Sequence, residues 1–403
     1  MKCSRFLVLL VSVLFFGCPP APEATIATTS PATSASPPAQ STPAPATRRV
    51  RKIAAPEVGR VRRSDRGPKN IILMIGDGMG VTQISAGLYS NNNRLNLERF
   101  PVIGLHKSYS ADNLITDSAA GATAFSAGVK TYNGAIGVDK DTVAVTTILE
   151  MAEAAGMPTG LVATSSIVHA TPASFYAHAR YRKNYEEIAA DLLQTDIDLF
   201  IGGGAKFFER REMDTLNLSD ALRQGGSTVA SFVDTPLKGL EVGEARRLAY
   251  YTADSEPVPF SQGREYLVDA STLAVDFLHR RDTSDLGFFL MIEGSQIDWG
   301  GHSNDSDYII AEMLEFDQAV GAVLDFAQRN GETLVIVTAD HETGGYAINN
   351  GSAMGAIQGA FTSDYHTADL IPVFAYGPGA EQFAGIYENT AIFDKMKLLY
   401  GFR

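Results

Sequence analysis

Short apolar runs and amphipathic stretches alternate along the chain from residue 70 onward. Six continuous apolar runs have the length and composition of strands that are covered on both faces. They lie at 70–75, 160–164, 198–201, 287–292, 334–338 and 371–375. Apolar residues recur at helical spacing in four segments between these runs, at 147–155, 185–193, 273–280 and 308–328. Strands that alternate with helices predict a mostly parallel sheet with helices on both of its faces.

One large domain accounts for most of the chain. Of the 403 residues, 45% are hydrophobic, which is enough to bury a large core. We expect this domain to cover residues 69–403, with an accessory segment at about 205–265 where no clear periodicity is visible. The net charge of −13 comes without a long basic block, so a nucleic-acid partner is disfavoured.

The first 18 residues have the pattern of a signal peptide. Lys2 and Arg5 precede an apolar run that is too short to span a bilayer. The run ends in Gly17 and Cys18, a pair that resembles a bacterial lipobox and makes Cys18 a candidate lipid anchor. The alternative is an ordinary signal peptide that is cleaved further along, so that Cys18 is removed. We therefore expect an exported protein that is periplasmic or anchored in the outer membrane as a lipoprotein, and otherwise secreted.

Residues 19–68 are predicted to be a linker. Pro, Ala, Thr and Ser dominate it up to residue 47, and such a composition buries too little apolar surface to offset the entropy of ordering. A basic patch follows from Arg48 onward, for which we favour a solvated linker end over attraction to an anionic membrane surface. Both cysteines lie in the first 18 residues, so the folded domain contains no disulfide.

Residues with metal-binding side chains cluster after the predicted strands. In open α/β sheets, chemistry collects at the carboxyl ends of the strands. The candidates that lie there or close by in sequence are Asp77, His169, Glu293, Asp298, His302, Asp340, His341 and His366. Each one alone has an ordinary explanation, such as a turn residue or a structural histidine. Together, mixed His and Asp ligands suit zinc, and the excess of carboxylates suggests more than one metal ion.

Two further residues have the chemistry of phosphate binding. Ser118 opens a run of small residues that we expect to be helical, and the free N–H groups of a helix start favour an anion. Arg182 carries a guanidinium fork that suits the paired oxygens of a phosphate. The alternatives are helix capping by Asp117 or Ser118 and a surface charge at Arg182.

These motifs resemble those of the alkaline phosphatase family. The most specific is TDSAAGATAFSAGVKTYNGAIGVD at 116–139, and VTADHETGG at 337–345 agrees with it in sequence order. The resemblance extends from residue 70 to the C-terminus apart from the middle segment. It implies a three-layer α/β/α sandwich with a large, mostly parallel central sheet. It also implies hydrolysis of small-molecule phosphate monoesters by way of a phosphoserine on Ser118.

The resemblance further implies a ligand set for each of three metal ions and a phosphate-binding role for Arg182. One zinc ion takes Asp77, Ser118, Asp340 and His341. The second zinc ion takes Asp298, His302 and His366. A third ion, usually magnesium, takes Asp77, Thr171 and Glu293.

Two positions vary within this pattern. His169 and Trp299 stand where some members of the family carry Asp and Lys. We place His169 beside the third ion but outside its ligands. An imidazole at that position is compatible with a softer divalent ion than magnesium. Trp299, the only tryptophan, is either a packing residue or a substrate contact.

Two other functions compete with this prediction. A phosphodiesterase or a sulfatase-like hydrolase uses the same metal core, but typically with Thr, or a modified Cys or Ser, in a different local sequence, so Asp117-Ser118-Ala119 argues against both. A non-catalytic lipoprotein that binds metal or phosphate needs no nucleophile, so Ser118 and Arg182 count against it. The sequence gives neither the physiological substrate nor the oligomeric state.

Overall fold

The computed structural model describes residues 67–240 and 242–403. The predicted signal peptide, Cys18 and all but the last two residues of the predicted linker lie outside these ranges. The expectations for export and lipidation therefore stay predictions of the sequence. Within the described ranges, no helix is both long and apolar enough to cross a membrane.

A sheet of ten strands forms the centre of the domain, in the order β14-β2-β13-β8-β1-β7-β3-β4-β6-β5. Its middle strand β1 (Asn70–Gly76) pairs in parallel with β7 (Phe289–Gly294) and β8 (Thr333–Thr338). Next to β7 lie β3 (Thr159–Ser166) and β4 (Leu199–Gly203), also parallel. The six apolar runs of the sequence correspond to these strands and to β13 (Leu370–Tyr376).

The strands at the two edges were not predicted. Beyond β8, β13 is antiparallel to both β8 and β2 (Val102–Lys107), and β14 (Gly385–Glu388) pairs with β2. At the other edge, β6 (Arg247–Tyr251) joins β4 and carries β5 (Ser227–Ser231). The segment 205–265 thus contributes two strands to the sheet, together with α6 (Ala205–Glu209) and α7 (Leu218–Gln224).

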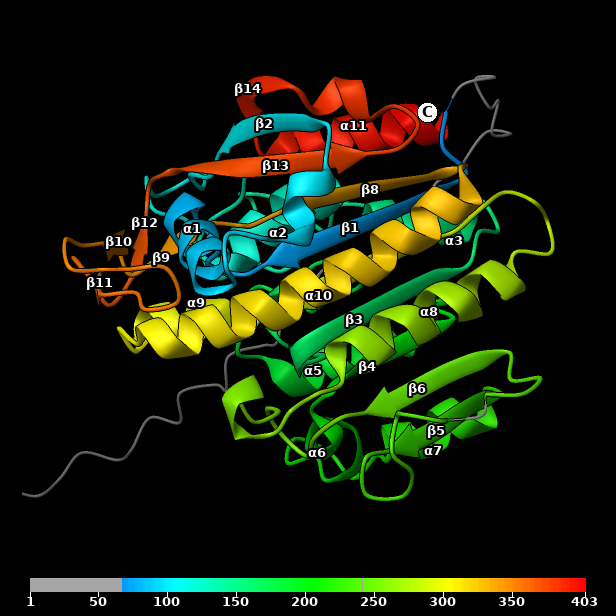
Figure 1. The fold of residues 1–403 in the computed structure, drawn as a ribbon. Helices are drawn as coiled ribbons and strands as arrows, with labels where there is room; N and C mark the ends of the chain where they lie inside the picture. Colours follow the sequence, from blue (N-terminus) through cyan, green and yellow to red (C-terminus); the bar gives the residue numbers. More distant parts are fainter. Residues whose placement is uncertain (1–66, 241) are drawn as a thin grey trace, which may run out of the picture. The chain divides into compact units, whose positions relative to one another are not determined.

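Helices cover both faces of the sheet (Figure 1). One layer contains α1 (Val81–Ser90), α8 (Leu267–Arg281) and α10 (Ser306–Asn330). The opposite layer contains α2 (Ser118–Ala127), α3 (Ile148–Ala154), α5 (Tyr185–Leu192) and α11 (Thr390–Tyr400).

Alternate side chains of β1 enter the two cores. Ile71, Leu73 and Ile75 pack into one core, whereas Ile72 and Met74 pack into the other. All five are fully buried, which explains why the strand reads as an unbroken apolar run. The predicted three-layer α/β/α sandwich with a mostly parallel sheet is confirmed.

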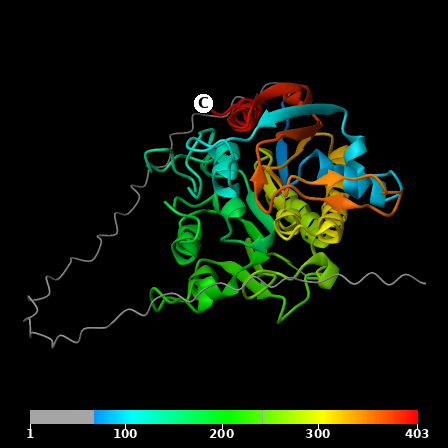
Figure 2. The same ribbon diagram turned by 90° about the vertical axis from the view of Figure 1, so that its left-hand side faces the viewer.

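Short elements complete the end of the domain that follows the carboxyl ends of the parallel strands, and this end faces the viewer in Figure 2. They are α4 (Ala170–Ala173), α9 (Gln296–His302), β9 (Glu342–Thr343), β10 (Ala347–Ile348), β11 (Gly359–Ala360) and β12 (His366–Thr367). Single 3-10 turns lie at Asn96–Arg99, Phe260–Gln262 and Ala380–Phe383. Most of the candidate site residues lie on these short elements and the turns around them, whereas Ser118 starts α2 and Glu293 lies in β7.

Candidate active site

Ser118 is the first residue of α2 and is almost fully buried. The preceding Asp117 caps the helix, because its side chain accepts a hydrogen bond from the Ala120 N–H at 3.0 Å. The helix approaches the end of β8 closely because position 121 is glycine. A Cβ at Gly121 would lie 2.9 Å from the Cβ of Asp340. This packing brings the Ser118 hydroxyl to the carboxyl ends of the strands.

Ser118, Asp77, Asp340 and His341 meet around one point. The Nε2 atom of His341 lies 3.3 Å from Ser118 Oγ and 3.2 Å from Asp340 Oδ2. It lies 3.5 Å from Asp77 Oδ1. Burial lowers the pKa of His341 well below its usual value, so the ring is neutral and these contacts are not ion pairs. The predicted ligands of the first zinc ion therefore lie together.

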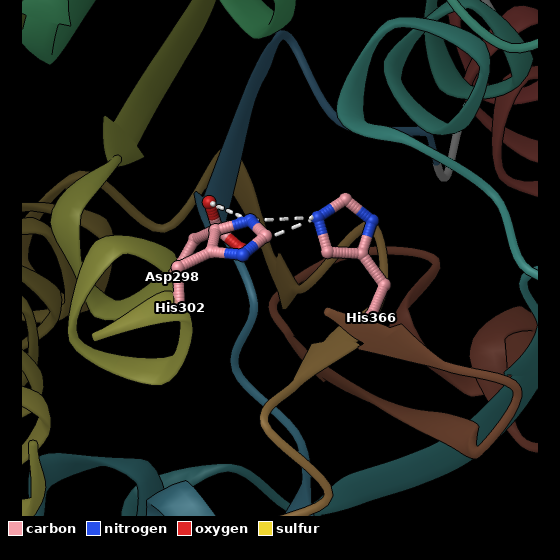
Figure 3. Close-up of side chains that lie close together, drawn as sticks. All are labelled: Asp298, His302 and His366. Atoms are coloured by element: carbon pink, nitrogen blue, oxygen red, sulfur yellow. Dashed lines mark hydrogen bonds and ion pairs between the residues drawn. The ribbon is translucent and has the colours of Figure 1, made fainter. Parts of the chain in front are cut away.

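Asp298, His302 and His366 form a second cluster (Figure 3). The first two are one turn apart on α9, and Asp298 Oδ2 lies 3.4 Å from His302 Nε2. His366, on β12, places its Nε2 atom 3.1 Å from that of His302 and 3.6 Å from Asp298 Oδ1. The ring of His366 also stacks on the ring of His341, with centroids 3.6 Å apart, so the two clusters are adjacent.

The Nδ1 atoms of His302 and His366 point away from the cluster toward backbone carbonyl oxygens. His302 Nδ1 lies 2.6 Å from the Asp364 carbonyl oxygen, and His366 Nδ1 lies 2.8 Å from the Thr116 carbonyl oxygen. A carbonyl oxygen only accepts, so each Nδ1 donates a proton to it. The two Nε2 atoms then face each other across 3.1 Å. A cation between them would be bound by both Nε2 atoms, and an Nδ1 that donates to a carbonyl oxygen is the usual arrangement of histidine ligands.

A third group joins Asp77 and Glu293 to His169, whose ring nitrogen lies within 4.8 Å of their carboxylate oxygens. Thr171, on α4, is fully buried next to Glu293. The sequence places His169 outside the ligands, whereas the structure brings its ring into the same group as the carboxylates. Asp77 belongs to this group and also lies with His341 and Asp298 in a second possible metal-binding group.

Several buried carboxylate oxygens of this site accept no hydrogen bond from the described residues. They are both oxygens of Asp77, Oε1 of Glu293 and Oδ2 of Asp340. Burial, together with the neighbouring carboxylates, raises the pKa of Asp77 well above its usual value. Burial likewise raises the pKa of Glu293 to about 8 and that of Asp340 to about 7. Buried carboxylates without hydrogen-bond donors, next to histidine rings, are suitable ligands for divalent cations, which would compensate the cost of burying them.

Arg182 reaches the site from the loop between α4 and α5. Its Nη1 donates to Asp117 Oδ2 at 2.9 Å, and its Nη2 lies 3.4 Å from His169 Nε2. The side chain is 20% exposed. Asp117 Oδ2 also accepts the Gly134 N–H at 3.0 Å. Asp117 therefore caps α2, as the sequence allowed, and it also orients Arg182, which the sequence pattern alone does not reveal.

A cavity of about 480 Å³ opens above Ser118. It is lined by Asp117, Ser118, His169, Arg182, Lys183, Tyr185, Asp298, Trp299, His302, Tyr365 and His366. Six of the predicted site residues and Trp299 thus share one opening. Lys183, Tyr185 and Tyr365 were not predicted, because nothing in their local sequence separates them from surface residues.

Two residues of the VTADHETGG motif support the ligands without being predicted as part of the site. Thr343 donates to Asp298 and lies 3.2 Å from His341 Nδ1. Glu342 is buried and accepts hydrogen bonds from Gln83 Nε2 at 2.7 Å and from the hydroxyl of Thr367. Glu342 thereby ties the turn after β8 to α1 and to the strand that carries His366.

Comparison with known proteins decides the family. The family model described as "Alkaline phosphatase" matches residues 68–240 and 261–362, which is more than half of the chain. The chain belongs to the alkaline phosphatase family. The predicted family is therefore confirmed, and the chain is a phosphoric monoester hydrolase of that family.

Relatives within the alkaline phosphatase family cover most of the chain. Alkaline phosphatase 3 of Bacillus subtilis (strain 168) is 34% identical over 80% of this chain and 87% of its own length. The alkaline phosphatase of Escherichia coli (strain K12) is 32% identical over 84% of this chain and 88% of its own length. The solved structure of the alkaline phosphatase of the Antarctic bacterium TAB5 is 45% identical with a TM-score of 0.78, and the match covers 84% of this chain and 99% of the TAB5 chain. A mutant of the TAB5 enzyme was solved with Mg bound in a site named M3, and it matches with 44% identity and a TM-score of 0.78 over the same shares of both chains.

Proposed function

We propose that this alkaline phosphatase hydrolyses small phosphate monoesters through a phosphoserine intermediate on Ser118, with two zinc ions and a third divalent ion. The observation that carries the proposal is the position of Ser118 Oγ. It lies 3.3 Å from His341 Nε2, in a cavity that also contains the Arg182 guanidinium. Unpaired carboxylate oxygens surround the same point.

Three sets of residues would hold the metal ions. Asp77, Asp340, His341 and the Ser118 oxygen are one set. Asp298, His302 and His366 are the second, and Asp77, Thr171 and Glu293 are the third. Two zinc ions bound there would supply Lewis acidity to the attacking and leaving oxygens of an in-line displacement and would make the serine a strong nucleophile.

The chain's own groups account for the remaining chemistry. Ser118 Oγ attacks phosphorus, the bond to the alcohol oxygen breaks, and the alcohol leaves with a proton. Water then attacks the phosphoserine, the bond between phosphorus and Oγ breaks, and inorganic phosphate departs. The N-terminus of α2 and the Arg182 fork stabilise the negative charge on the phosphoryl oxygens. Because Asp117 already holds Arg182, little ordering is needed when substrate binds.

The identity of the third ion depends on His169. Magnesium prefers an all-oxygen environment, which Asp77, Thr171 and Glu293 offer. His169 adds a nitrogen to the group, and imidazole suits softer ions such as zinc. Magnesium is our first proposal, and the TAB5 structure with Mg in its M3 site is a mutant in which aspartate replaces a histidine. The His169 ring makes another divalent ion the alternative.

One experiment tests the reaction class. Purified enzyme supplied with zinc and magnesium should turn over a phosphate monoester much faster than a diester or a sulfate ester with the same leaving group. A higher kcat/KM for the diester would assign the chain to phosphodiester hydrolysis, and a higher value for the sulfate ester to sulfate-ester hydrolysis. Absence of any turnover would favour a non-catalytic binding protein.

Removing the Arg182 side chain should weaken catalysis without abolishing it. Arg182→Ala should lower kcat/KM by about 10–1,000-fold, equivalent to about 1.4–4 kcal/mol, because the guanidinium fork binds phosphoryl oxygens while the metal ligands stay in place. Arg182→Lys should recover only part of this loss, since an ammonium is a point charge. Steady-state kinetics and inhibition by inorganic phosphate measure both effects.

The exposed Arg180, two residues away, provides the matched control. Arg180→Ala should leave kcat/KM and the phosphate inhibition constant unchanged. If Arg182→Ala binds inorganic phosphate as tightly as the parent enzyme, Arg182 does not contact the phosphoryl group.

A further inference from the structure

The cavity above Ser118 has a polar floor and an aromatic rim. At the floor, Ser118 and His366 are 2% and 5% exposed. At the rim, Tyr365 is 47% exposed, and Trp299 and Tyr185 are partly exposed. Its volume of about 480 Å³ lies within the range of about 300–1,000 Å³ found for pockets that enclose whole small molecules. The cavity therefore has room for the alcohol part of the ester as well as for the phosphoryl group.

Each of the three rim aromatics is held by another ring. Tyr365 stacks on His366 with centroids 4.4 Å apart and planes at 7°. Trp299 meets the His169 ring at 6.1 Å in an edge-on contact. Tyr185 lies against Phe207 with centroids 5.0 Å apart.

The three rings come from three parts of the fold. Trp299 is on α9, Tyr185 starts α5, and Tyr365 precedes β12. Rings that are already fixed lose little conformational entropy when a ligand packs against them.

We propose that this aromatic rim is a leaving-group subsite for alcohols that carry a flat aromatic group, so that the enzyme prefers nucleoside monophosphates to simple sugar phosphates. The inference rests on the proposed function, because it assigns the alcohol part of the ester that Ser118 cleaves. Stacking of a base on an aromatic side chain is favourable and tolerates any base, because every base has a π-face. A sugar without a base offers the rim no π-face to stack on.

The other groups that line the cavity do not select for a planar alcohol. In the proposed reaction, the phosphoryl group of the ester meets Ser118, Arg182 and the histidines of the cavity, and all monoesters share that group. Lys183 is an exposed cation at the cavity and attracts the phosphate charge of any ester equally. Discrimination between alcohols therefore falls to Trp299, Tyr365 and Tyr185.

Substrate pairs with the same leaving oxygen test the proposal. Adenosine 5′-monophosphate and ribose 5-phosphate both release a primary 5′-alcohol and differ in the base. Uridine and dihydrouridine 5′-monophosphates differ in whether the base is flat. We expect kcat/KM to be about tenfold higher for the planar member of each pair, with the difference mainly in KM.

Variants of the rim should remove this preference. Trp299→Leu and Tyr365→Leu should each reduce the ratio of kcat/KM for adenosine 5′-monophosphate to that for ribose 5-phosphate to about threefold or less. Tyr365→Phe, which keeps the ring, should preserve the ratio. Lys183→Ala is the matched control at the same opening, and it should change both substrates equally. Any change in metal occupancy also affects both substrates equally, so the ratio is insensitive to it.

Equal kcat/KM values for both members of each pair in the parent enzyme would overturn the subsite. So would a preference that survives in both leucine variants. These outcomes are distinct from failure of the proposed function, which would appear as an absence of turnover for every monoester or as turnover that does not require Ser118.

Discussion

Replacing Ser118 by alanine is expected to lower kcat/KM for phosphate monoesters by at least about 10⁴-fold, while zinc content stays at the parent level. The large loss follows because Oγ is the atom that bonds to phosphorus, and a nucleophile acts as a unit with the groups that activate it. Ser118 carries the only aliphatic hydroxyl among the residues that line the cavity. The other three proposed ligands of the first zinc ion, Asp77, Asp340 and His341, are untouched by the substitution, so metal binding should persist.

Ser126 provides a matched control on the same helix. It is buried two turns further along α2, and its hydroxyl donates to the Ser174 carbonyl oxygen at 2.6 Å. Ser126→Ala should cost about 1 kcal/mol of stability and leave kcat/KM close to the parent value. An active Ser118→Ala enzyme would place the nucleophile elsewhere. If the Ser118→Ala protein had lost its zinc, the metal loss and not the missing nucleophile would explain its inactivity.

Removing the metal ions should abolish activity and also weaken the fold. Asp77, Glu293 and Asp340 are fully buried and carry oxygens without hydrogen-bond donors among the described residues. Cations that bind only the folded state stabilise it, so chelation should lower the urea concentration at the unfolding midpoint. Adding zinc should restore both activity and the midpoint, and magnesium should raise activity further.

Single ligand substitutions localise this effect. His302→Ala or Asp340→Ala should reduce the zinc bound per chain by about one ion, measured by elemental analysis after dialysis. The exposed His279 on α8 is the control, and His279→Ala should keep the parent zinc content. Full zinc stoichiometry in His302→Ala or Asp340→Ala would remove that residue from the ligand set.

The buried strands were predictable because both of their faces are covered. Strand β1 packs into a core on each side and therefore appears as one apolar run. Strand β2 was missed because only Gly104 and His106 of its six residues are buried, so it contains no continuous buried apolar run. Helix α8 begins at Leu267, six residues before the predicted start at 273. Leu267 and Ala270 of this additional stretch are buried in the same core as α10.

Most of the predicted metal ligands follow strands whose carboxyl ends meet at one edge, so the sequence was enough to group them as candidates. The residues that orient them were not predicted. Thr343 contacts Asp298 across 45 positions, and Asp117 contacts Arg182 across 65. Such contacts depend on how separate turns meet, and no local pattern records that. His169 was predicted outside the ligand set, and that its ring nitrogen lies within 4.8 Å of the Asp77 and Glu293 oxygens is a fact that the sequence alone does not give.

Acid quenching during turnover tests the central claim most directly. The enzyme would be mixed with a monoester labelled in its phosphoryl group, stopped at low pH, digested and analysed by mass spectrometry. We predict one labelled peptide, with the phosphate on Ser118, in the parent enzyme and none in Ser118→Ala. Label on another residue, or an active parent enzyme that never carries label, would contradict a phosphoserine intermediate at this position.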